Sequence, residues 1–294
     1  MSQPTPSAPV IAVVGAGAVG GLIAALLHRT GVDVVAVARP DTARTIAEDG
    51  LTIHSRQFGD GVSRIRVATR IPAGAHVILA TKAAALPALA PEIGSARPAE
   101  IVSLLNGIEH LAVLHDAAPG SVVAGASVAV ESTRLAPTVI EHRSPFLRLT
   151  VPAHAADTAI VLAWQAAGFD VTIGGSDNDV LWTKLRFLAP MALLTSHWRL
   201  PIGAAVDRDP ALTLALLTEV AQIATLDGVP TDAGQLARAL AALPPGMRSS
   251  LQNDLEAEQA NELDAIGGAV ARRGLAVGAD TATVDRLVAD LRAR

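Results

Sequence analysis

The sequence contains two lysines, Lys82 and Lys184, against 21 arginines. Arginine keeps its proton, whereas a buried lysine can shift its pKa and release one. Because arginine fills almost every position that needs only a positive charge, each lysine is a candidate for chemistry. The alternative is that codon bias and chance left two lysines without a special role.

A glycine pattern near the N-terminus predicts a dinucleotide site. Gly15, Gly17 and Gly20 lie between a β-branched run over 10–14 and a helix-like stretch over 21–27. In such a unit the first glycine makes the turn, the second admits a pyrophosphate, and the third allows close packing. The helix N-terminus offers free N–H groups to the phosphates. The predicted cofactor-binding residues of this loop are Gly15, Ala16, Gly17, Ala18, Val19 and Gly20.

The end of the second predicted strand, over 34–38, distinguishes NADP from NAD. An NAD site usually carries an acidic residue there, which binds the ribose 2′-hydroxyl group. This chain has Arg39 instead, a cation that can bind the 2′-phosphate of NADP. The sequence therefore predicts NADP, as NADPH, as the cofactor. In the alternative, Arg39 is a solvated loop residue and Asp41 binds the ribose.

Two further apolar segments, 77–80 and 101–105, are predicted to be parallel strands. Lys82 follows the first segment and Asn106 follows the second. Because ligands bind beyond the carboxyl ends of parallel strands, both side chains are predicted at a ligand crevice. Lys82 can neutralise charge or orient a carboxylate, and Asn106 offers both donor and acceptor groups. The alternatives are a surface lysine and an ordinary Asn-Gly turn.

The second half of the sequence is predicted to be helical. Proline and glycine interrupt its Ala- and Leu-rich stretches at Pro201, Pro210, 228–230, 244–246 and Gly274. Lys184 shares a helix face with Leu188, Ala192 and Thr195, which recur at near-helical spacing. A lysine among apolar residues at a domain cleft can have a lowered pKa and act as general acid. The alternative is a lysine whose ammonium group reaches solvent.

A later polar segment contains Ser250, Asp254 and Glu262. In one interpretation Ser250 caps a helix, and Asp254 and Glu262 lie on its solvated face. In the other, Ser250 and Glu262 contact different parts of a cofactor–substrate pair, because a continuous helix would hold them too far apart for one small group.

Composition excludes several classes of function. Without cysteine there is no disulfide, thiolate metal site or cysteine nucleophile. A net charge of −5, few aromatic residues and no basic run argue against nucleic acid as a partner. The eight histidines, including His110, show no metal-ligand spacing and are interpreted as structural. The uncharged stretch over 8–27 is broken by glycines and lacks signal-peptide features, which predicts a cytoplasmic protein without a membrane partner.

The length of 294 residues predicts two domains, with the turn at 174–178 as the boundary. We predict an NADP-binding Rossmann domain over 1–175, built on a mostly parallel, doubly wound α/β sheet. An all-α domain for substrate binding and dimerisation is predicted over 176–294, and its apolar surface could form a homodimer interface. Residues 1–9 look like a loose tail.

These motifs together resemble the ketopantoate reductase (2-dehydropantoate 2-reductase) family. The resemblance runs nearly end to end through the glycine loop, 38–39, 81–82, 105–107, 182–185, 249–250 and 261–266. It implies a Rossmann domain followed by a helical domain, with the active site between them. It also implies hydride transfer from NADPH to the carbonyl group of a small-molecule 2-keto acid.

The resemblance implies roles for individual residues. Lys184 would be the catalytic general acid that protonates the new alkoxide, and Asn106 would orient substrate and cofactor. Lys82 would lie at the cofactor, and Ser250 would bind the substrate carboxylate. Glu262 would contact substrate or cofactor.

The chain departs from the family on the helix after the lysine. The family usually carries asparagines four and eight residues on, where this chain has Leu188 and Ala192. A buried polar group that loses its partner costs about 1–3 kcal/mol. The substrate is therefore ketopantoate if other polar side chains compensate, and a less polar 2-keto acid if they do not. The candidates for compensation are Thr195, Ser196 and His197.

Two other functions fit part of the sequence. Dehydrogenases of the hydroxyacid or 6-phosphogluconate type also pair a Rossmann domain with a helical one and a catalytic lysine. Their glycine turn, however, usually carries a methionine that is absent here. A non-catalytic protein that binds NADP to sense redox state would explain the missing asparagines, but it would not need Lys184, Asn106 and Glu262.

Overall fold

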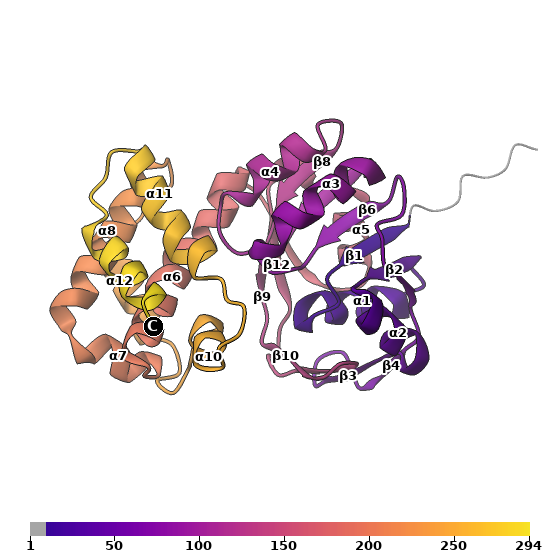
Figure 1. The fold of residues 1–294 in the computed structure, drawn as a ribbon, viewed down its shortest axis with the longest axis horizontal. Coiled ribbons are helices and arrows are strands. Elements are labelled where there is room, and N and C mark those ends of the chain that lie inside the picture. Colours follow the sequence, from indigo (N-terminus) through magenta and orange to yellow (C-terminus); the bar gives the residue numbers. More distant parts are fainter. Residues whose placement is uncertain (1–9) are drawn as a thin grey trace, which may run out of the picture. The chain divides into compact units, whose positions relative to one another are not determined.

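The computed structural model describes residues 10–294, so the tail predicted over 1–9 lies outside the described residues. Figure 1 follows the chain through its two compact units. The first unit comprises the residues up to Thr81, Ala85–Leu105 and His110–Asp177, and the second comprises Lys82–Ala84, Asn106–Glu109 and Asn178–Arg294. Two short segments that follow strands in the chain, 82–84 and 106–109, thus belong to the second unit.

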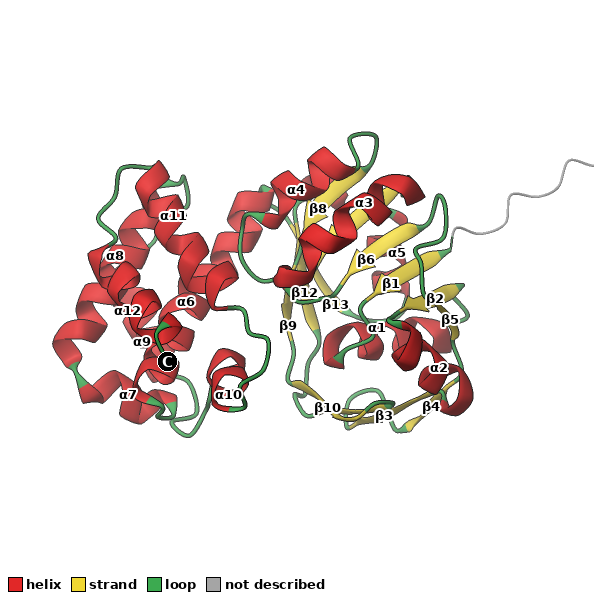
Figure 2. Ribbon diagram, in the orientation of Figure 1, coloured by secondary structure: helices red, strands yellow, loops and turns green. Residues whose placement is uncertain are grey.

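The first unit is built on a six-stranded sheet in the order β5-β2-β1-β6-β7-β8, with every neighbouring pair parallel. Its strands are β1 (Ile11–Val14), β2 (Val34–Val37), β5 (Arg66–Ala68), β6 (His76–Leu79), β7 (Glu100–Ser103) and β8 (Val122–Gly125). Residues of β1 and β2 are buried throughout, which explains their continuous apolar sequence. The predicted Rossmann architecture is confirmed (Figure 2).

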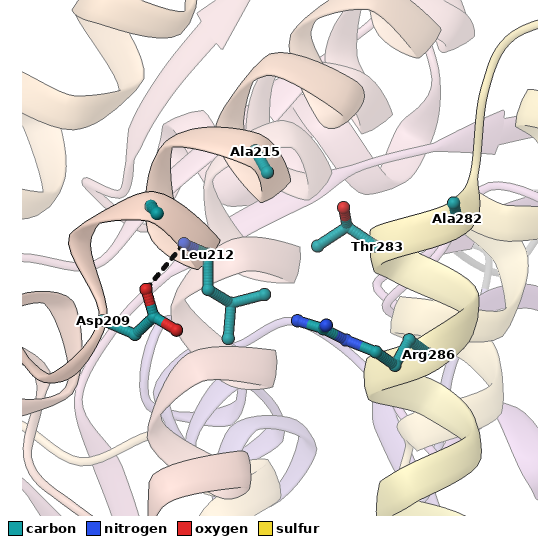
Figure 3. A pocket seen from close by; sticks show the side chains of 7 residues that line it. Asp209, Leu212, Ala215, Ala282, Thr283 and Arg286 are labelled. Carbon is teal, nitrogen blue, oxygen red and sulfur yellow. Dashed lines mark hydrogen bonds between the residues drawn. The ribbon is translucent and has the colours of Figure 1, made fainter.

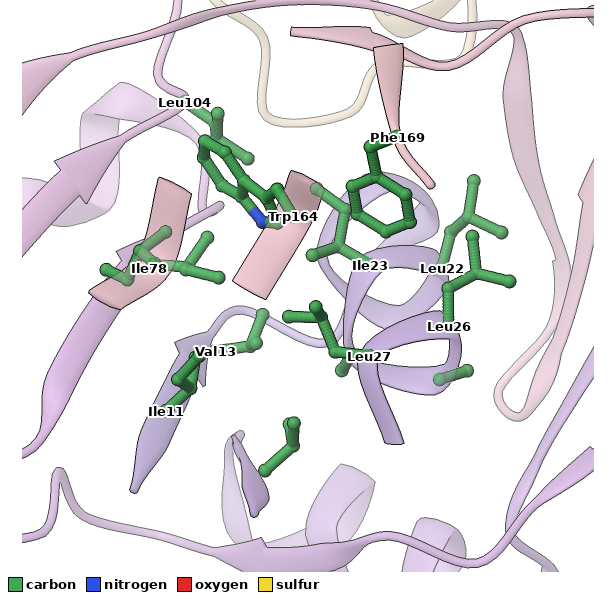
Figure 4. Close-up of a cluster of buried hydrophobic side chains, with 14 of the residues drawn as sticks. Ile11, Val13, Leu22, Ile23, Leu26, Leu27, Ile78, Leu104, Trp164 and Phe169 are labelled. Atoms are coloured by element: carbon green, nitrogen blue, oxygen red, sulfur yellow. The ribbon is translucent and has the colours of Figure 1, made fainter. Parts of the chain in front are cut away.

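Helices pack on this sheet to form an aliphatic core. They are α1 (Ala18–Arg29), α2 (Pro40–Asp49), α3 (Leu86–Ala96), α4 (His110–Ala117) and α5 (Ala159–Ala166). Ile23 and Leu27 of α1 lie in one buried cluster with Val13 of β1 (Figure 4). Trp164 of α5 and Ile78 of β6 belong to the same cluster and are fully buried. Because aromatic residues are scarce, the other side chains of this core are mostly aliphatic.

Two smaller sheets accompany the parallel sheet, in the orders β10-β11-β3-β4 and β13-β12-β9. Their strands are β3 (Leu51–Ser55), β4 (Gly61–Ser63), β9 (Ser127–Ala129), β10 (Ser132–Ala136), β11 (Val139–His142), β12 (Arg148–Val151) and β13 (Asp170–Ile173). Several of these strands are short and partly exposed, so their apolar pattern is weak and the sequence did not predict the two sheets.

The second unit is helical, as predicted. Its elements are α6 (Asp177–Trp198), α7 (Ile202–Arg208), α8 (Pro210–Leu226), α9 (Ala233–Ala241), α10 (Ser250–Glu256), the π-helical turn η3 (Asp264–Gly268), α11 (Ala269–Ala276) and α12 (Ala282–Arg292). The prediction of a break at Gly274 is wrong, because this residue lies inside α11. A Cβ atom at Gly274 would lie 2.3 Å from the side chain of Thr281, so glycine there permits close packing.

Helix α6 carries Lys184, and Asp227 anchors its first turns. Trp182 Nε1 donates a hydrogen bond to Asp227 Oδ2 at 2.6 Å, and Asn178 Nδ2 donates to the Asp227 carbonyl oxygen at 2.6 Å. Arg273 Nε donates to Asp227 Oδ1 at 2.6 Å, which leaves both carboxylate oxygens bonded. Since Trp182 is also fully buried, the backbone around Lys184 is held by packing and by hydrogen bonds.

His110, at the start of α4, is a buried titratable group. Neither of its ring nitrogens has a hydrogen-bond partner within residues 10–294. Burial lowers the pKa of its imidazole to about 4, whereas an unperturbed histidine has a pKa of about 6.5. Between these values the unfolded chain binds more protons than the folded one. The contribution of neutral His110 to the unfolding free energy is therefore fully present above about pH 6.5, and it is lost as the pH drops toward 4.

We expect His110→Leu to remove this acid sensitivity. The wild type should lose up to about 3 kcal/mol of unfolding free energy between pH 8 and pH 4 because His110 becomes protonated on unfolding. The variant should not show this loss. Urea unfolding at the two pH values measures the difference. His115→Leu, an exposed position on the same helix, is the matched control. The same pH dependence in wild type and His110→Leu would show that His110 titrates normally in the fold.

Candidate active site

The glycine loop between β1 and α1 has the geometry that a dinucleotide phosphate requires. Gly15 has a positive φ of 99°, and a Cβ atom there would lie 2.7 Å from the Ala80 carbonyl oxygen. A Cβ atom at Gly20 would lie 2.0 Å from the Gly15 carbonyl oxygen, whereas nothing lies within 4 Å of one at Gly17. Gly17 is the N-cap of α1 and provides no side-chain hydrogen bond, and the first turn has no acidic residue. The loop therefore fits a pyrophosphate, because it leaves open space at Gly17 and no side chain caps the N–H groups of the first turn of α1.

Arg39 lies two residues after β2, as the N-cap of α2, and is exposed. Asp41, the alternative ribose ligand, pairs with Arg44 at 3.0 Å. Within the described residues no ion pair engages Arg39. Its guanidinium group is thus available to a phosphate, while the neighbouring carboxylate already has a cationic partner.

In the second unit, Glu262 connects the predicted site residues. Asn106 Nδ2 donates a hydrogen bond to Glu262 Oε2 at 2.8 Å, and the backbone N–H of Ala83 donates to Oε1 at 3.4 Å. The charge of Glu262 also acts on Lys184. Asn106 Oδ1 is buried and has no partner among the described residues, so it can accept a hydrogen bond from a ligand. The structure thus brings together Asn106, Lys184 and Glu262.

Lys184 is half-buried on α6. Burial lowers the pKa of its ammonium group to about 8, while the negative charge of Glu262 raises it. In the described part of the chain, no hydrogen bond or ion pair holds Lys184 Nζ. The group is therefore largely protonated at neutral pH and free to give its proton to a ligand.

Lys82 has two partners in the second unit. Its Nζ donates to Asp254 Oδ2 at 2.9 Å and to the carbonyl oxygen of Ala260. The interpretation that Asp254 and Glu262 both lie on a solvated helix face is therefore wrong, because each accepts a hydrogen bond from a predicted site residue. The helix is also not continuous, since α10 ends at Glu256 and η3 begins at Asp264.

The interpretation of Ser250 as a helix cap is wrong by one residue. Ser249 is the N-cap of α10 and accepts a hydrogen bond from the Gln252 N–H at 3.1 Å. Its hydroxyl also bonds to Thr195 Oγ1 at 2.7 Å. Ser250 is exposed in the first turn of α10, and in the described chain no hydrogen bond joins it to Lys184 or Glu262. Ser250 thus keeps its hydroxyl free, while Ser249 is committed to the fold.

Of the polar residues that could compensate for Leu188 and Ala192, only Thr195 has its side chain hydrogen-bonded. The Ser196 hydroxyl and His197 Nδ1 are buried and have no hydrogen-bond partner among the described residues. Thr195 is fully buried, and its hydroxyl donates to the Met191 carbonyl oxygen at 2.8 Å besides its bond to Ser249. Arg294 Nη1 donates to the carbonyl oxygens of Ser196 and His197, which lie at the C-terminal end of α6. His197 Nδ1 lies 3.7 Å from Asp290 of α12. These contacts place Ser196 and His197 beside the C-terminal segment.

A surface pocket found in the second unit contains none of the predicted site residues. It has a volume of about 450 Å³ and lies at the N-termini of α8 and α12. Arg286 faces Asp209 and Leu212 across it (Figure 3). Across residues 10–294, no His, Cys, Asp and Glu side chains gather in a group of three that could bind a metal ion. No helix in that range is long and apolar enough to cross a membrane.

Sequence reasoning missed two sets of contacts. Asp254 binds Lys82, which precedes it by 172 residues. Arg272 binds Glu109, which precedes it by 163 residues. Neither pair has a local signal, because the partners lie far apart in the sequence and charged side chains are ordinarily solvated.

Comparisons with known proteins agree with this geometry. The family model "Ketopantoate reductase PanE/ApbA" matches residues 11–155, and "Ketopantoate reductase PanE/ApbA C terminal" matches residues 178–294. An uncharacterized oxidoreductase, YkpB, from Bacillus subtilis is 27% identical over 87% of this chain and 89% of its own. A 2-dehydropantoate 2-reductase from Halobacterium salinarum is 25% identical over 90% and 91%. The crystal structure of a ketopantoate reductase from Ralstonia eutropha has a TM-score of 0.87 at 26% identity and covers 97% of both chains.

Both halves of the chain are therefore matched by one family. The parallel sheet and its glycine loop form a dinucleotide-binding fold, and the family that matches both halves of the chain consists of oxidoreductases that use a nicotinamide cofactor. The chain belongs to the ketopantoate reductase family.

Proposed function

We propose that this chain reduces a 2-keto acid to a 2-hydroxy acid with NADPH, and that Lys184 is the general acid. The observation that carries the proposal is the environment of Lys184. Burial lowers the pKa of its ammonium group, and the negative charge of Glu262 opposes this shift. Glu262 in turn binds Asn106, whose Oδ1 has no partner in the described chain. One carboxylate thus binds the side chain that carries the open acceptor and acts electrostatically on the proton donor.

In this proposal some residues bind the cofactor and substrate, and Lys184 transfers the proton. A bound NADPH supplies the hydride. The glycine loop holds its pyrophosphate, Arg39 binds its 2′-phosphate, and Lys82 keeps a third N–H donor for it beside its two protein partners. Lys184 Nζ gives its proton to the carbonyl oxygen as that oxygen becomes an alkoxide, and Glu262 keeps Lys184 protonated beforehand. Asn106 orients cofactor and substrate, and Ser250 binds the substrate carboxylate.

The substrate we propose is less polar than ketopantoate, although it shares the 2-keto acid group. Leu188, one helical turn after Lys184, is half-buried and offers no hydrogen bond. The hydroxyl of Thr195 is used by Ser249 and Met191, so it does not replace the missing partner. Ser196 and His197 lie at the C-terminal end of α6, about two turns beyond Leu188, so we do not expect them to reach a substrate hydroxyl beside Leu188. A substrate hydroxyl beside Leu188 would lose its water without gaining a protein partner.

The broader assignments rest on the same proposal. We assign NADP binding to residues 1–175, and substrate binding and dimerisation to 176–294. A homodimer and a cytoplasmic location remain predictions, and a place in pantothenate biosynthesis would follow only if ketopantoate were the substrate. Reduction of a 2-keto acid by purified protein tests the function itself, with NADPH oxidation followed by absorbance.

Replacing Lys184 should remove the proton donor. We expect Lys184→Ala and Lys184→Arg to lower kcat by about 10²–10⁴-fold, because arginine keeps the charge but does not release its proton. In the wild type, kcat/KM should fall as the pH rises above about 8, where Lys184 loses its proton. A pH profile from 6 to 10 measures this limb. Full activity in Lys184→Arg would exclude proton transfer from this residue.

Replacing Arg39 should weaken the preference for NADPH. We expect Arg39→Ala to raise KM for NADPH about tenfold or more and to leave KM for NADH nearly unchanged, since only NADPH carries the 2′-phosphate. Initial rates with both cofactors give the ratio. Arg44→Ala is the control, because it removes an exposed cation that already pairs with Asp41. Equal effects on both cofactors would mean that Arg39 does not bind the 2′-phosphate.

Substrate preference should depend on one hydroxyl group. Trimethylpyruvate is ketopantoate without its hydroxyl, so the two compounds form a matched pair. We expect kcat/KM to favour trimethylpyruvate about ten- to a hundredfold, as an unpaired buried hydroxyl costs about 1–3 kcal/mol. Leu188→Asn should move the ratio toward ketopantoate, while Leu188→Val should not. A wild-type preference for ketopantoate would show that the chain supplies a polar partner elsewhere.

A further inference from the structure

An ion-pair network ties the segment Asn106–Glu109 to the helices of the second unit. Arg272 of α11 donates to Glu109 from Nε at 2.8 Å and from Nη2 at 2.6 Å. The same guanidinium donates to Asp264 Oδ1 at 3.0 Å and to Oδ2 at 3.1 Å. We call Arg272, Glu109 and Asp264 the Arg272 clamp. Arg292 of α12 also binds Asp264, at 2.6 Å, but among the described residues no hydrogen bond or ion pair joins it to Glu109.

Both carboxylates of the clamp are close in the chain to residues of the candidate active site. Glu109 follows Asn106 by three residues, and Asp264 follows Glu262 by two. Between the first pair, Gly107 has a positive φ of 92°, and a Cβ atom there would lie 2.4 Å from the Ala265 carbonyl oxygen. The backbone beside Asn106 thus lies directly against the η3 turn that follows Glu262. The clamp and the Asn106–Glu262 hydrogen bond therefore connect the same two segments of the chain.

The clamp is suited to fixing geometry more than to stabilising the fold. The side chains of Arg272 and Glu109 are 45% and 47% exposed. Exposed ion pairs of this kind contribute about 0–1 kcal/mol to stability. A bidentate arginine, however, sets the orientation of both partners. Hydrogen bonds to Glu109 and then to Asp264 raise the pKa of Arg272, so its charge is permanent.

We propose that the Arg272 clamp positions Asn106 against Glu262, and that Arg272 is therefore a positioning residue for the reduction. This inference rests on the proposed function. Without the clamp the segment Asn106–Glu109 is held at fewer points, and the Asn106–Glu262 hydrogen bond forms for less of the time. Asn106 then presents its open acceptor to the ligand in varying orientations. A misplacement of 1 Å can cost about a hundredfold in rate, so a looser segment should cost about tenfold.

The test combines kinetics with hydrogen exchange on the full chain. Arg272→Gln is compared with Arg292→Gln, which removes an arginine from the same Asp264 but leaves Glu109 bound. Each substitution is made in the wild type and in an Asn106→Ala background, with trimethylpyruvate and ketopantoate as substrates. Exchange of the backbone amides over 106–109 is followed by mass spectrometry in the same proteins. Should Arg272→Gln fold poorly, Glu109→Gln breaks the same contact from the other side.

We expect Arg272→Gln to lower kcat/KM about tenfold in the wild type and to have no effect once Asn106 is alanine, because the two residues act as one unit. Amide exchange over 106–109 should become faster with Arg272→Gln and stay unchanged with Arg292→Gln. An equal loss in both backgrounds, no loss, or unchanged exchange would overturn the proposal. If the wild type reduces no 2-keto acid, the proposed function fails and the catalytic role of the clamp with it. The exchange comparison then still decides whether the clamp holds this segment.

Discussion

The candidate active site depends on the carboxylate of Glu262. Burial alone would drive Lys184 toward the neutral amine, which has no proton to donate at neutral pH. The charge of Glu262 opposes this effect, and the two influences leave the pKa of Lys184 at about 8. Glu262 itself is held by neutral donors, the Asn106 amide and the Ala83 N–H, which orient the carboxylate without cancelling its charge. Lys184 is thus kept protonated without being bound in an ion pair among the described residues.

The cofactor loop depends on a constraint of a different kind, the close approach of backbones. The chain moves from β1 outward to β2 and β5 on one side and returns to β6 on the other, so the strand order reverses between β1 and β6. Ligands of open parallel sheets bind beyond such a reversal. Here the register of β1 and β6 brings the Ala80 carbonyl oxygen to Gly15, where a side chain would not fit. The glycines are therefore required by the sheet as much as by the phosphates.

Local features were predictable from the sequence, and contacts between distant residues were not. The strand–turn–helix unit, the parallel sheet and the helical second half follow from apolar periodicity and glycine spacing, which act over a few residues. The sequence could not distinguish Ser249 from Ser250 as the N-cap, because both precede the same helix and only the burial of Ser249 against Thr195 decides. It also missed the end of α10, since residues 257–263 keep a helix-like composition.

The role of Asp254 shows why the missed contacts concern function. Its spacing from Ser250 is that of an exposed helical residue, and only the fold brings it to Lys82. The same holds for Glu109 and Arg272. Side chains that organise a site by pairing across the chain are charged and partly exposed, so they look like ordinary surface residues until a structure identifies the partner.

The apolar character of the helix after Lys184 links proton donation to substrate choice. Burial lowers the pKa of Lys184, and Leu188 is the half-buried side chain one turn further along the same face. In the proposed mechanism, the lack of a polar group there withholds a hydrogen bond from a substrate hydroxyl and leaves the ammonium group without a polar neighbour on this face. A polar residue at this position would help both the hydroxyl and the ammonium, and would make Lys184 a weaker acid. On this argument the chain cannot recover a polar substrate at position 188 without also changing its proton donor.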